Sequence, residues 1–274
     1  MPYINNKLLK RHSSHNIRVI LLFISLLAII FFTIKSLNNL SAGTLFSYPE
    51  TIANDSYGIQ ELSLADINKD TYLDIIAVNS NANSIDVYIN PSSTNAIWTK
   101  KTVVTSTQGL LSVLTLDIDN DSDIDIIYTD TTSFAINLNT NLDGSGNSWQ
   151  SSSVTSTAGA IKSMCSCDLN KDGNIDIVAA DDIRGRIFYM QNKLNVNNSW
   201  QSFSIYENPK SPSSLSCRDI DNDGDIDVVS TSQSINTILW HENVTGNGDE
   251  WETHSILTTT SFANNLYVTD LDND

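Results

Sequence analysis

Five short acidic segments of the chain recur with the same spacing of oxygen-bearing side chains. Four of them are complete, and each places Asp or Asn at positions 1, 3, 5 and 9 of a nine-residue loop. With position 7, which also offers a backbone carbonyl, the candidate ligands are Asp66, Asn68, Asp70, Tyr72 and Asp74; Asp117, Asp119, Asp121, Asp123 and Asp125; Asp168, Asn170, Asp172, Asn174 and Asp176; Asp219, Asp221, Asp223, Asp225 and Asp227. The fifth segment begins the same pattern with Asp270, Asp272 and Asp274.

This pattern of ligands predicts a calcium site in each loop. Ca²⁺ takes six to eight hard oxygen ligands in a flexible geometry, and alternate residues of a tight loop converge on one point. The Ile or Leu side chains at positions 2 and 8 are expected to pack inward. Gly173 and Gly224 at position 6 suit a sharp turn, whereas Thr71 and Ser122 occupy position 6 in the first two loops, which we therefore expect to be looser.

Other acidic motifs fit the loops less well. An EF-hand requires Glu at position 12 and flanking helices, but position 12 is occupied by Ala77, Tyr128, Ala179 and Ser230, and the flanking residues read as strands. An Asp-x-Asp glycosyltransferase site would occur once, and ordinary acidic turns do not need oxygens at four fixed positions. Because so many carboxylates repel each other without a cation, the sequence predicts that the calcium is structural.

The loops belong to a longer repeat of 51 residues. The opening aspartates of the five segments are separated by 51 residues at each step. Two further sets keep the same period without insertions: Trp98, Trp149, Trp200 and Trp251; Asn90, Asn141, Asn192 and Asn243. Repeats of this length are typical of propellers and solenoids.

Each repeat reads as four short strands, so the predicted fold class is all-β. Apolar runs such as residues 75–78 and 177–180 follow the acidic loops and fit strands covered on both faces. Four strands per repeat favour a β-propeller over residues 46–274, with about four and a half blades; a β-solenoid is the main alternative. Residues 46–52 align with a fourth strand, and the fifth repeat stops inside its loop, so we expect a fragment of a longer propeller.

An apolar helix is expected before the propeller, at residues 19–35. Residues 1–18 are basic and predicted to be cytoplasmic, and residues 36–45 form a linker. We favour an uncleaved signal anchor, which makes the chain a single-pass type II protein of the cell surface, in contact with the membrane through this segment. A cleaved signal peptide, giving a secreted protein, and a buried core helix are the alternatives.

The charged residues, the cysteines and the histidines limit the functions that the chain can have. All 32 acidic residues but only ten of the 15 basic residues follow residue 35, and such a surface excludes nucleic acid as a partner. The three cysteines, Cys165, Cys167 and Cys217, are expected to be buried free thiols. His241 and His254 are expected on a strand surface, and no catalytic residues are predicted.

The loop of Asp219 to Asp227, together with Trp240-His241-Glu242-Asn243 and Trp251, resembles the FG-GAP/VCBS repeat family, which includes the integrin α-subunit propellers. The resemblance covers about residues 46–274. It implies a propeller with calcium between the first and second strands of a blade, extracellular placement, and a protein or glycan ligand. A literal Phe-Gly-Gly-Ala-Pro element is absent. Two other functions stay open: the propeller domain of a secreted lyase or dehydratase, and a scaffold for downstream domains.

Overall fold

A computed structural model describes residues 51–53, 58–93, 96–106, 109–156, 159–197, 199–207, 211–258 and 265–270. The chain divides into two units, Met1–Thr51 and Ile52–Asp274, and the second is described here. The helix expected at residues 19–35 lies outside the described residues. Within those ranges, no helix has the length and apolar character needed to cross a membrane.

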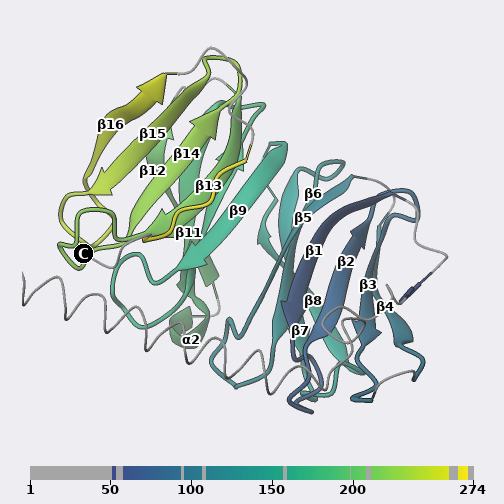
Figure 1. Cartoon of the computed structure of the whole chain (residues 1–274). Coiled ribbons are helices and arrows are strands. Elements are labelled where there is room, and N and C mark those ends of the chain that lie inside the picture. Colours follow the sequence, from purple (N-terminus) through teal and green to yellow (C-terminus); the bar gives the residue numbers. More distant parts are fainter. Residues whose placement is uncertain are drawn as a thin grey trace, which may run out of the picture. The chain divides into compact units, whose positions relative to one another are not determined.

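The described chain forms 16 strands in four antiparallel sheets, I to IV, each built from four consecutive strands (Figure 1). Sheet I contains β1 (Ile59–Ala65), β2 (Asp74–Asn79), β3 (Ser84–Ile89) and β4 (Thr99–Thr105). Sheet II contains β5 (Leu110–Leu116), β6 (Asp125–Asp130), β7 (Ala135–Asn141) and β8 (Trp149–Thr155). Sheet III contains β9 (Ile161–Cys167), β10 (Asp176–Asp181), β11 (Arg186–Lys193) and β12 (Ser199–Glu207). Sheet IV contains β13 (Pro212–Arg218), β14 (Asp227–Ser232), β15 (Thr237–Asn243) and β16 (Trp251–Thr258).

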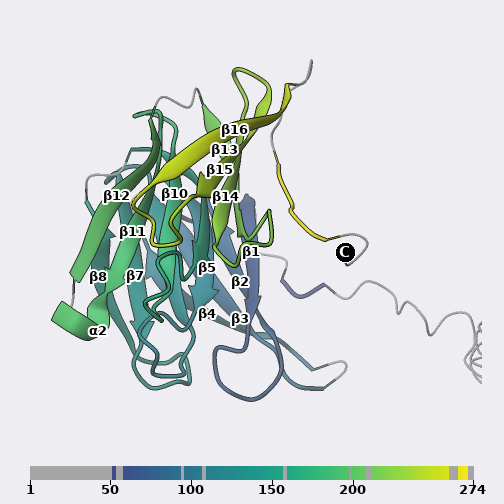
Figure 2. The ribbon, with the colours of Figure 1, turned by 90° about the vertical axis from the view of Figure 1, so that its left-hand side faces the viewer.

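Each sheet corresponds to one sequence repeat. The acidic loop joins the first strand to the second, and the tryptophan of the 51-residue period starts the fourth strand in sheets II and IV. The second strands β10 and β14 are buried along their whole length. The continuous apolar run of residues 177–180 predicts this for β10, whereas β14 buries Ser230, Thr231 and Ser232 after its two valines. A single four-residue helix among the described residues, α2 (Leu194–Asn197), lies between β11 and β12 at one end of the sheets (Figure 2).

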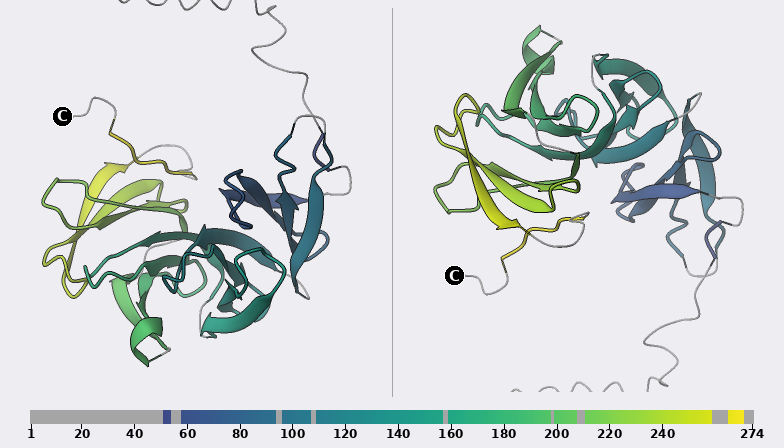
Figure 3. Two further views of the ribbon diagram at one scale, coloured as in Figure 1. Left: turned by 90° about the horizontal axis from the view of Figure 1, so that it is seen from below. Right: turned by 90° about the horizontal axis from the view of Figure 1, so that it is seen from above.

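The sheets follow one another in chain order, and their first strands lie side by side (Figure 3). β1 contacts β5, β5 contacts β9, and β9 contacts β13. The hydrophobic core is divided among the three junctions between neighbouring sheets. For example, Ile136 of sheet II and Phe188 of sheet III are buried in one cluster, and Tyr189 of sheet III is buried with Val228 of sheet IV in another. Each sheet is therefore held through its neighbours, as in repeat proteins.

Hydrogen bonds between residues 52 apart connect the first strands. The Glu61 carboxylate accepts the Val113 N–H at 2.7 Å, and the Ser163 hydroxyl accepts the Leu215 N–H at 3.1 Å. The Ser214 hydroxyl accepts the N–H of Leu266 at 3.2 Å. Leu266 belongs to residues 265–270, which run beside β13 (Figure 1), so the fifth repeat starts against sheet IV as sheet IV starts against sheet III.

A disulfide links Cys165 of β9 to Cys217 of β13, with the two Cα atoms 6.0 Å apart. The prediction that these two cysteines are free thiols was therefore wrong, and Cys167 is the free thiol of the three. The pairing follows from the contact between first strands: it has the same offset of 52 as the hydrogen bond of 2.7 Å between the hydroxyls of Ser63 and Thr115. The disulfide thus covalently joins sheets III and IV.

We expect the substitution Cys165→Ser to lower the free energy of unfolding by about 2–4 kcal/mol, because the disulfide closes a long loop of the unfolded chain. The melting temperature should fall by roughly 4–16 °C. Thermal melting without reductant measures this, with Cys167→Ser as the matched control that leaves the disulfide intact. Equal melting temperatures for the two variants would contradict the cross-link.

Candidate metal centre

The four complete acidic loops share one backbone conformation. Positions 4 and 6 have positive φ in every loop, and position 6 has φ of 74° at Thr71, 72° at Ser122, 86° at Gly173 and 90° at Gly224. The left-handed region is unfavourable for Thr and Ser, yet both adopt it. The first two loops therefore form the same turn as the loops with glycine at position 6.

The carboxylates at positions 1 and 5 accept hydrogen bonds from backbone N–H groups of their own loop. In the third loop, Asp168 Oδ1 accepts the N–H of Asp172 at 3.0 Å, and Asp168 Oδ2 accepts the N–H of Gly173 at 2.9 Å. Asp172 Oδ1 in turn accepts the N–H of Asn174 at 2.9 Å. The other loops repeat most of these bonds, such as those from the Asp70 and Thr71 N–H groups to Asp66. The carboxylates of Asp168 and Asp172 are thereby oriented before any ion binds.

The aspartate at position 9 is the buried anchor of each loop. Asp176 is 0% exposed, and its two oxygens accept the N–H groups of Leu169 at 3.2 Å and Asn192 at 2.8 Å. Asp74, Asp125 and Asp227 accept the same two kinds of N–H group. Burial raises the pKa of Asp125 and of Asp176 to about 7, and these hydrogen bonds only partly oppose it.

In the second and fourth loops the carboxylates at positions 1, 3 and 9 converge. Oxygens of Asp117, Asp119 and Asp125 lie within 4.8 Å of one another, and so do oxygens of Asp219, Asp221 and Asp227. In the first and third loops, position 3 is an Asn, whose amide group donates to the carboxylate at position 5. The predicted alternate-residue convergence therefore occurs among the carboxylates of the second and fourth loops.

Unpaired buried oxygens show that a cation fits these two loops. Oδ1 of Asp119 and Oδ1 of Asp219 are buried and have no hydrogen-bond partner among the described residues. Burial, followed by the charge of Asp121, raises the pKa of Asp119. A buried carboxylate oxygen without a partner is costly, and a hard divalent cation with oxygen preference would satisfy it.

Side chains at position 7 face the preceding loop. The Lys69 ammonium pairs with Asp123, and the Lys171 ammonium pairs with Asp225. At the junction between these two, the Asn120 amide donates to Asn174 Oδ1 at 3.5 Å. Position 4 of one loop thus contacts position 7 of the next at all three junctions, leaving the position 7 carbonyl as the group available to an ion. Tyr72 is exposed, and Asp272 and Asp274 lie outside the described residues.

The repeated asparagine is a functional residue whose role the sequence did not reveal. Asn192 is fully buried, and its side chain amide donates to the carbonyl of Ile118, at position 2 of the preceding loop, at 2.8 Å. Asn141 and Asn243 make the same bond to Ile67 at 3.1 Å and to Leu169 at 3.0 Å. Because these three asparagines each bond to the preceding loop, we call Asn141, Asn192 and Asn243 the latch asparagines. They connect the first three acidic loops to the sheets that follow them.

A turn after the latch asparagine packs against the same preceding loop. The Trp149 indole N–H donates to the Gly146 carbonyl at 3.1 Å, and a Cβ at Gly146 would lie 2.7 Å from Cγ2 of Ile67. Ile67 is 1% exposed, in agreement with the inward packing expected for position 2. Leu73, at position 8 of the first loop, is 56% exposed, so that expectation was wrong there.

The raised pKa values predict an unusual pH dependence of the metal-free protein. The pKa of Asp in an unfolded chain is about 3.9, whereas the pKa of Asp125 and of Asp176 in the folded state is about 7. Between these values the folded state binds more protons, so stability falls as pH rises from about 4 to about 7. In chelator, we expect a lower melting temperature at pH 7.5 than at pH 5. Saturating calcium, which favours the ionised carboxylates, should remove or reverse this trend; a metal-free protein that is more stable at pH 7.5 would contradict it.

The two histidines of sheet IV differ in their exposure to solvent. His241 is 0% exposed, so its predicted surface position was wrong, and it contacts the Ser230 and Thr253 hydroxyls at 2.9 Å each. Burial lowers the pKa of His241 to about 4, which keeps the ring neutral. His254 is partly exposed, and its Nε2 lies 2.7 Å from Glu242 Oε2.

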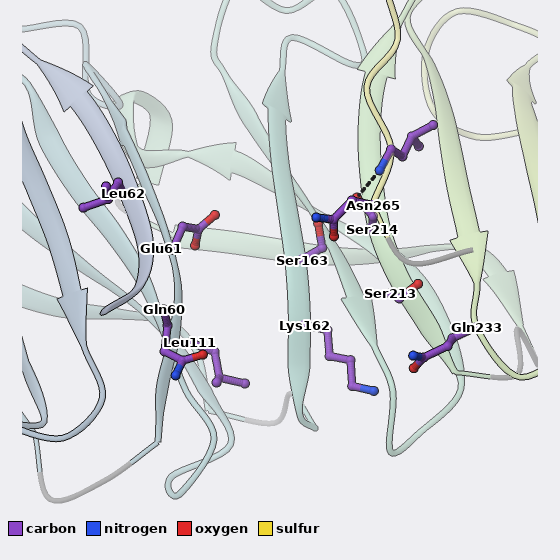
Figure 4. A pocket seen from close by; sticks show the side chains of 11 residues that line it. Gln60, Glu61, Leu62, Leu111, Lys162, Ser163, Ser213, Ser214, Gln233 and Asn265 are labelled. Atoms are coloured by element: carbon purple, nitrogen blue, oxygen red, sulfur yellow. Dashed lines mark hydrogen bonds between the residues drawn. The ribbon is translucent and has the colours of Figure 1, made fainter. Parts of the chain in front are cut away.

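A polar cavity lies at the beginning of the first strands, whereas the acidic loops follow their ends. Figure 4 shows the side chains that line this cavity. Its volume is ≈ 750 Å³, and it is lined by equivalent positions of successive repeats, including Gln60, Leu111, Lys162 and Ser213. Lys162 is paired with Asp182 at 2.7 Å. Burial raises the pKa of Glu61, which also borders the cavity.

Four consecutive antiparallel sheets, each with an Asp-rich loop between its first two strands, define a propeller-like repeat protein. A family model described as an FG-GAP-like repeat matches residues 66–128, 117–179 and 219–274, well over half of the chain. The chain therefore belongs to the FG-GAP-like repeat family, as the sequence resemblance predicted.

One solved structure similar to this chain is the V. cholerae biofilm matrix protein Bap1. The two are 18% identical with a TM-score of 0.35, and the match covers 72% of this chain and 39% of the Bap1 chain. A search among curated proteins found no match.

Proposed function

We propose that this chain is a calcium-stabilised β-propeller module that recognises a protein or glycan outside the cytoplasm. The observation that carries the proposal is a contrast between the two ends of the first strands. At one end, every complete repeat has Asp at positions 1, 5 and 9 of its acidic loop and the same asparagine after its third strand. At the other end, the equivalent cavity residues Gln60, Leu111, Lys162 and Ser213 all differ, and in the adjacent set Glu61 and Asn265 differ from Ser163 and Ser214, which are alike. A constant scaffold that carries a variable polar pocket suits recognition.

The arrangement of the sheets supports a propeller. First strands lie next to one another at every junction, as the innermost strands of blades do. In sheets II to IV, residues Val113, Met164 and Leu215 are buried against the preceding sheet, while the equivalent Leu62 of sheet I is 60% exposed. Leu62 thus marks the face on which another blade would pack when the ring closes.

Calcium is assigned a structural role in this proposal. The loops contact neighbouring loops and latch asparagines, and they lie away from the cavity, so bound Ca²⁺ would hold blades together. Asp117, Asp119, Asp125 and the equivalent fourth-loop residues would supply carboxylate ligands. We assign no catalysis to the chain and no nucleic-acid partner.

Placement outside the cytoplasm is the last part of the proposal. The disulfide between Cys165 and Cys217 suits an oxidising compartment. The apolar segment at residues 19–35 supplies the export signal, either as an uncleaved type II anchor at the cell surface or as a cleaved signal peptide.

Binding of the full chain to arrays of glycans and of extracellular proteins, in calcium, tests the proposed recognition. A ligand should be found whose affinity falls at least about tenfold, roughly 1.4 kcal/mol, in the variant Lys162→Ala. Lys100→Ala, which removes a charge on β4 outside the cavity, is the matched control. Equal loss in both variants, or turnover of a polysaccharide by the chain, would contradict the proposal.

A further inference from the structure

Two glutamates and a histidine gather on sheet IV, outside the acidic loops. Glu242 of β15 and Glu252 of β16 are direct partners in the register of the two strands, and His254 lies two residues after Glu252, on the same face. Each offers a ligand atom, and the three atoms lie within 4.8 Å of one another. The three side chains are partly buried or exposed, so an ion from solvent can reach them.

The combination occurs in one repeat only. Moving back by 51 residues at each step replaces Glu242, Glu252 and His254 by Gln191, Gln201 and Phe203, then by Thr140, Gln150 and Ser152, and then by Ile89, Thr99 and Lys101. None of these sets combines carboxylates with an imidazole. Three strong metal ligands have therefore appeared together at adjacent positions of a single sheet.

The local contacts orient the cluster for a cation. Two glutamates directly opposite each other on neighbouring strands destabilise a sheet through like-charge repulsion. His254 Nε2 lies 2.7 Å from Glu242 Oε2. The Trp240 ring packs on the His254 ring, with centroids 4.5 Å apart. This packing fixes the direction of the imidazole.

The geometry points to a binding site for a divalent transition-metal ion of the Zn²⁺ type at Glu242, Glu252 and His254. One imidazole and two carboxylates are ligands that Zn²⁺ accepts, with water in the remaining position. Zn–N and Zn–O bonds of about 2.0–2.2 Å place the ligand atoms of a tetrahedral site roughly 3.4 Å from one another. The glutamate side chains therefore need to move by only about an ångström to bind the ion. Calcium prefers more ligands, all of them oxygen, which separates this site chemically from the acidic loops.

Titration of the full chain with Zn²⁺, and with Co²⁺ as a coloured substitute, tests the site. Excess Ca²⁺ is kept present to saturate the acidic loops. We expect one equivalent of Zn²⁺ to bind by calorimetry, and Co²⁺ to give visible absorption bands that Zn²⁺ abolishes. The variant His254→Phe, which installs the residue of sheet III, should weaken Zn²⁺ binding at least about 100-fold and remove the Co²⁺ bands.

Glu242→Gln copies sheet III in the same way and should also weaken Zn²⁺ binding at least about tenfold. Glu250→Gln is the matched control, because it removes an equal charge next to the cluster while leaving all three ligands in place. Melting temperature in calcium reports whether each variant is folded. Absence of Zn²⁺ binding to the unaltered chain, or unchanged binding in folded His254→Phe, would overturn the proposal.

Discussion

Chelation of calcium is expected to lower the melting temperature of this chain by about 12–24 °C. Sixteen of its 32 acidic residues lie in the four complete loops. There Asp119 and Asp219 each hold a buried oxygen that no described residue hydrogen-bonds. If free Ca²⁺ is about ten times the dissociation constant, each site adds about 1.4 kcal/mol and four sites add about 6 kcal/mol. A domain of this size shifts by roughly 2–4 °C per kcal/mol.

Scanning calorimetry in calcium and in chelator measures this shift, and magnesium at equal ionic strength is the control for general screening of charge. Magnesium demands a smaller, near-octahedral site, so it should restore only a minor part of the lost stability. A melting temperature that does not change on chelation, or that magnesium restores fully, would contradict a structural role of calcium in the loops.

Removal of a latch asparagine is the second change with a large expected effect. Asn192→Ala removes two donated hydrogen bonds, to Ile118 and Ile175, and one accepted from Leu194. The buried Ile118 carbonyl left unpaired costs about 1–2 kcal/mol, and each of the two part-buried bonds contributes about 0.5–1.5 kcal/mol. The free energy of unfolding should therefore fall by about 2–5 kcal/mol. Because the lost bond to Ile118 joins two sheets, the unfolding transition should also become less cooperative.

Asn90 supplies the matched control for this measurement. It is the equivalent residue of sheet I, and its side chain donates to Leu73 of its own loop in an exposed setting. Denaturant unfolding of Asn90→Ala should therefore show a loss of only about 1 kcal/mol. Similar losses in Asn90→Ala and Asn192→Ala would mean that the bond to the preceding loop adds no stability.

The repeat could be predicted from the sequence because the residues that recur every 51 positions make contacts within their own repeat. The aspartate at position 9 accepts the N–H of position 2 in its own loop, as Asp176 does from Leu169, so their spacing appears in one repeat and recurs in the next. The four-stranded sheets, the loop between the first and second strands and the family were predicted for this reason.

Contacts between sheets could not be predicted in the same way. The Cys165–Cys217 disulfide joins residues 52 apart, and the Asn192 latch bond joins residues 74 apart. Neither separation predicts a contact until it is known that the first strands lie side by side and that each loop contacts the following sheet. Burial of His241 depends on Tyr206 of sheet III, whose ring lies 5.0 Å from it, so this error has the same origin.

The number of calcium ions held by each chain tests the central claim most directly. After equilibrium dialysis against buffered calcium, elemental analysis should find at least four ions per chain, and one fewer in the variant Asp221→Ala, which removes a converging carboxylate of the fourth loop. Fewer than four ions per chain, or an unchanged count in Asp221→Ala, would contradict the assignment of a calcium site to each acidic loop.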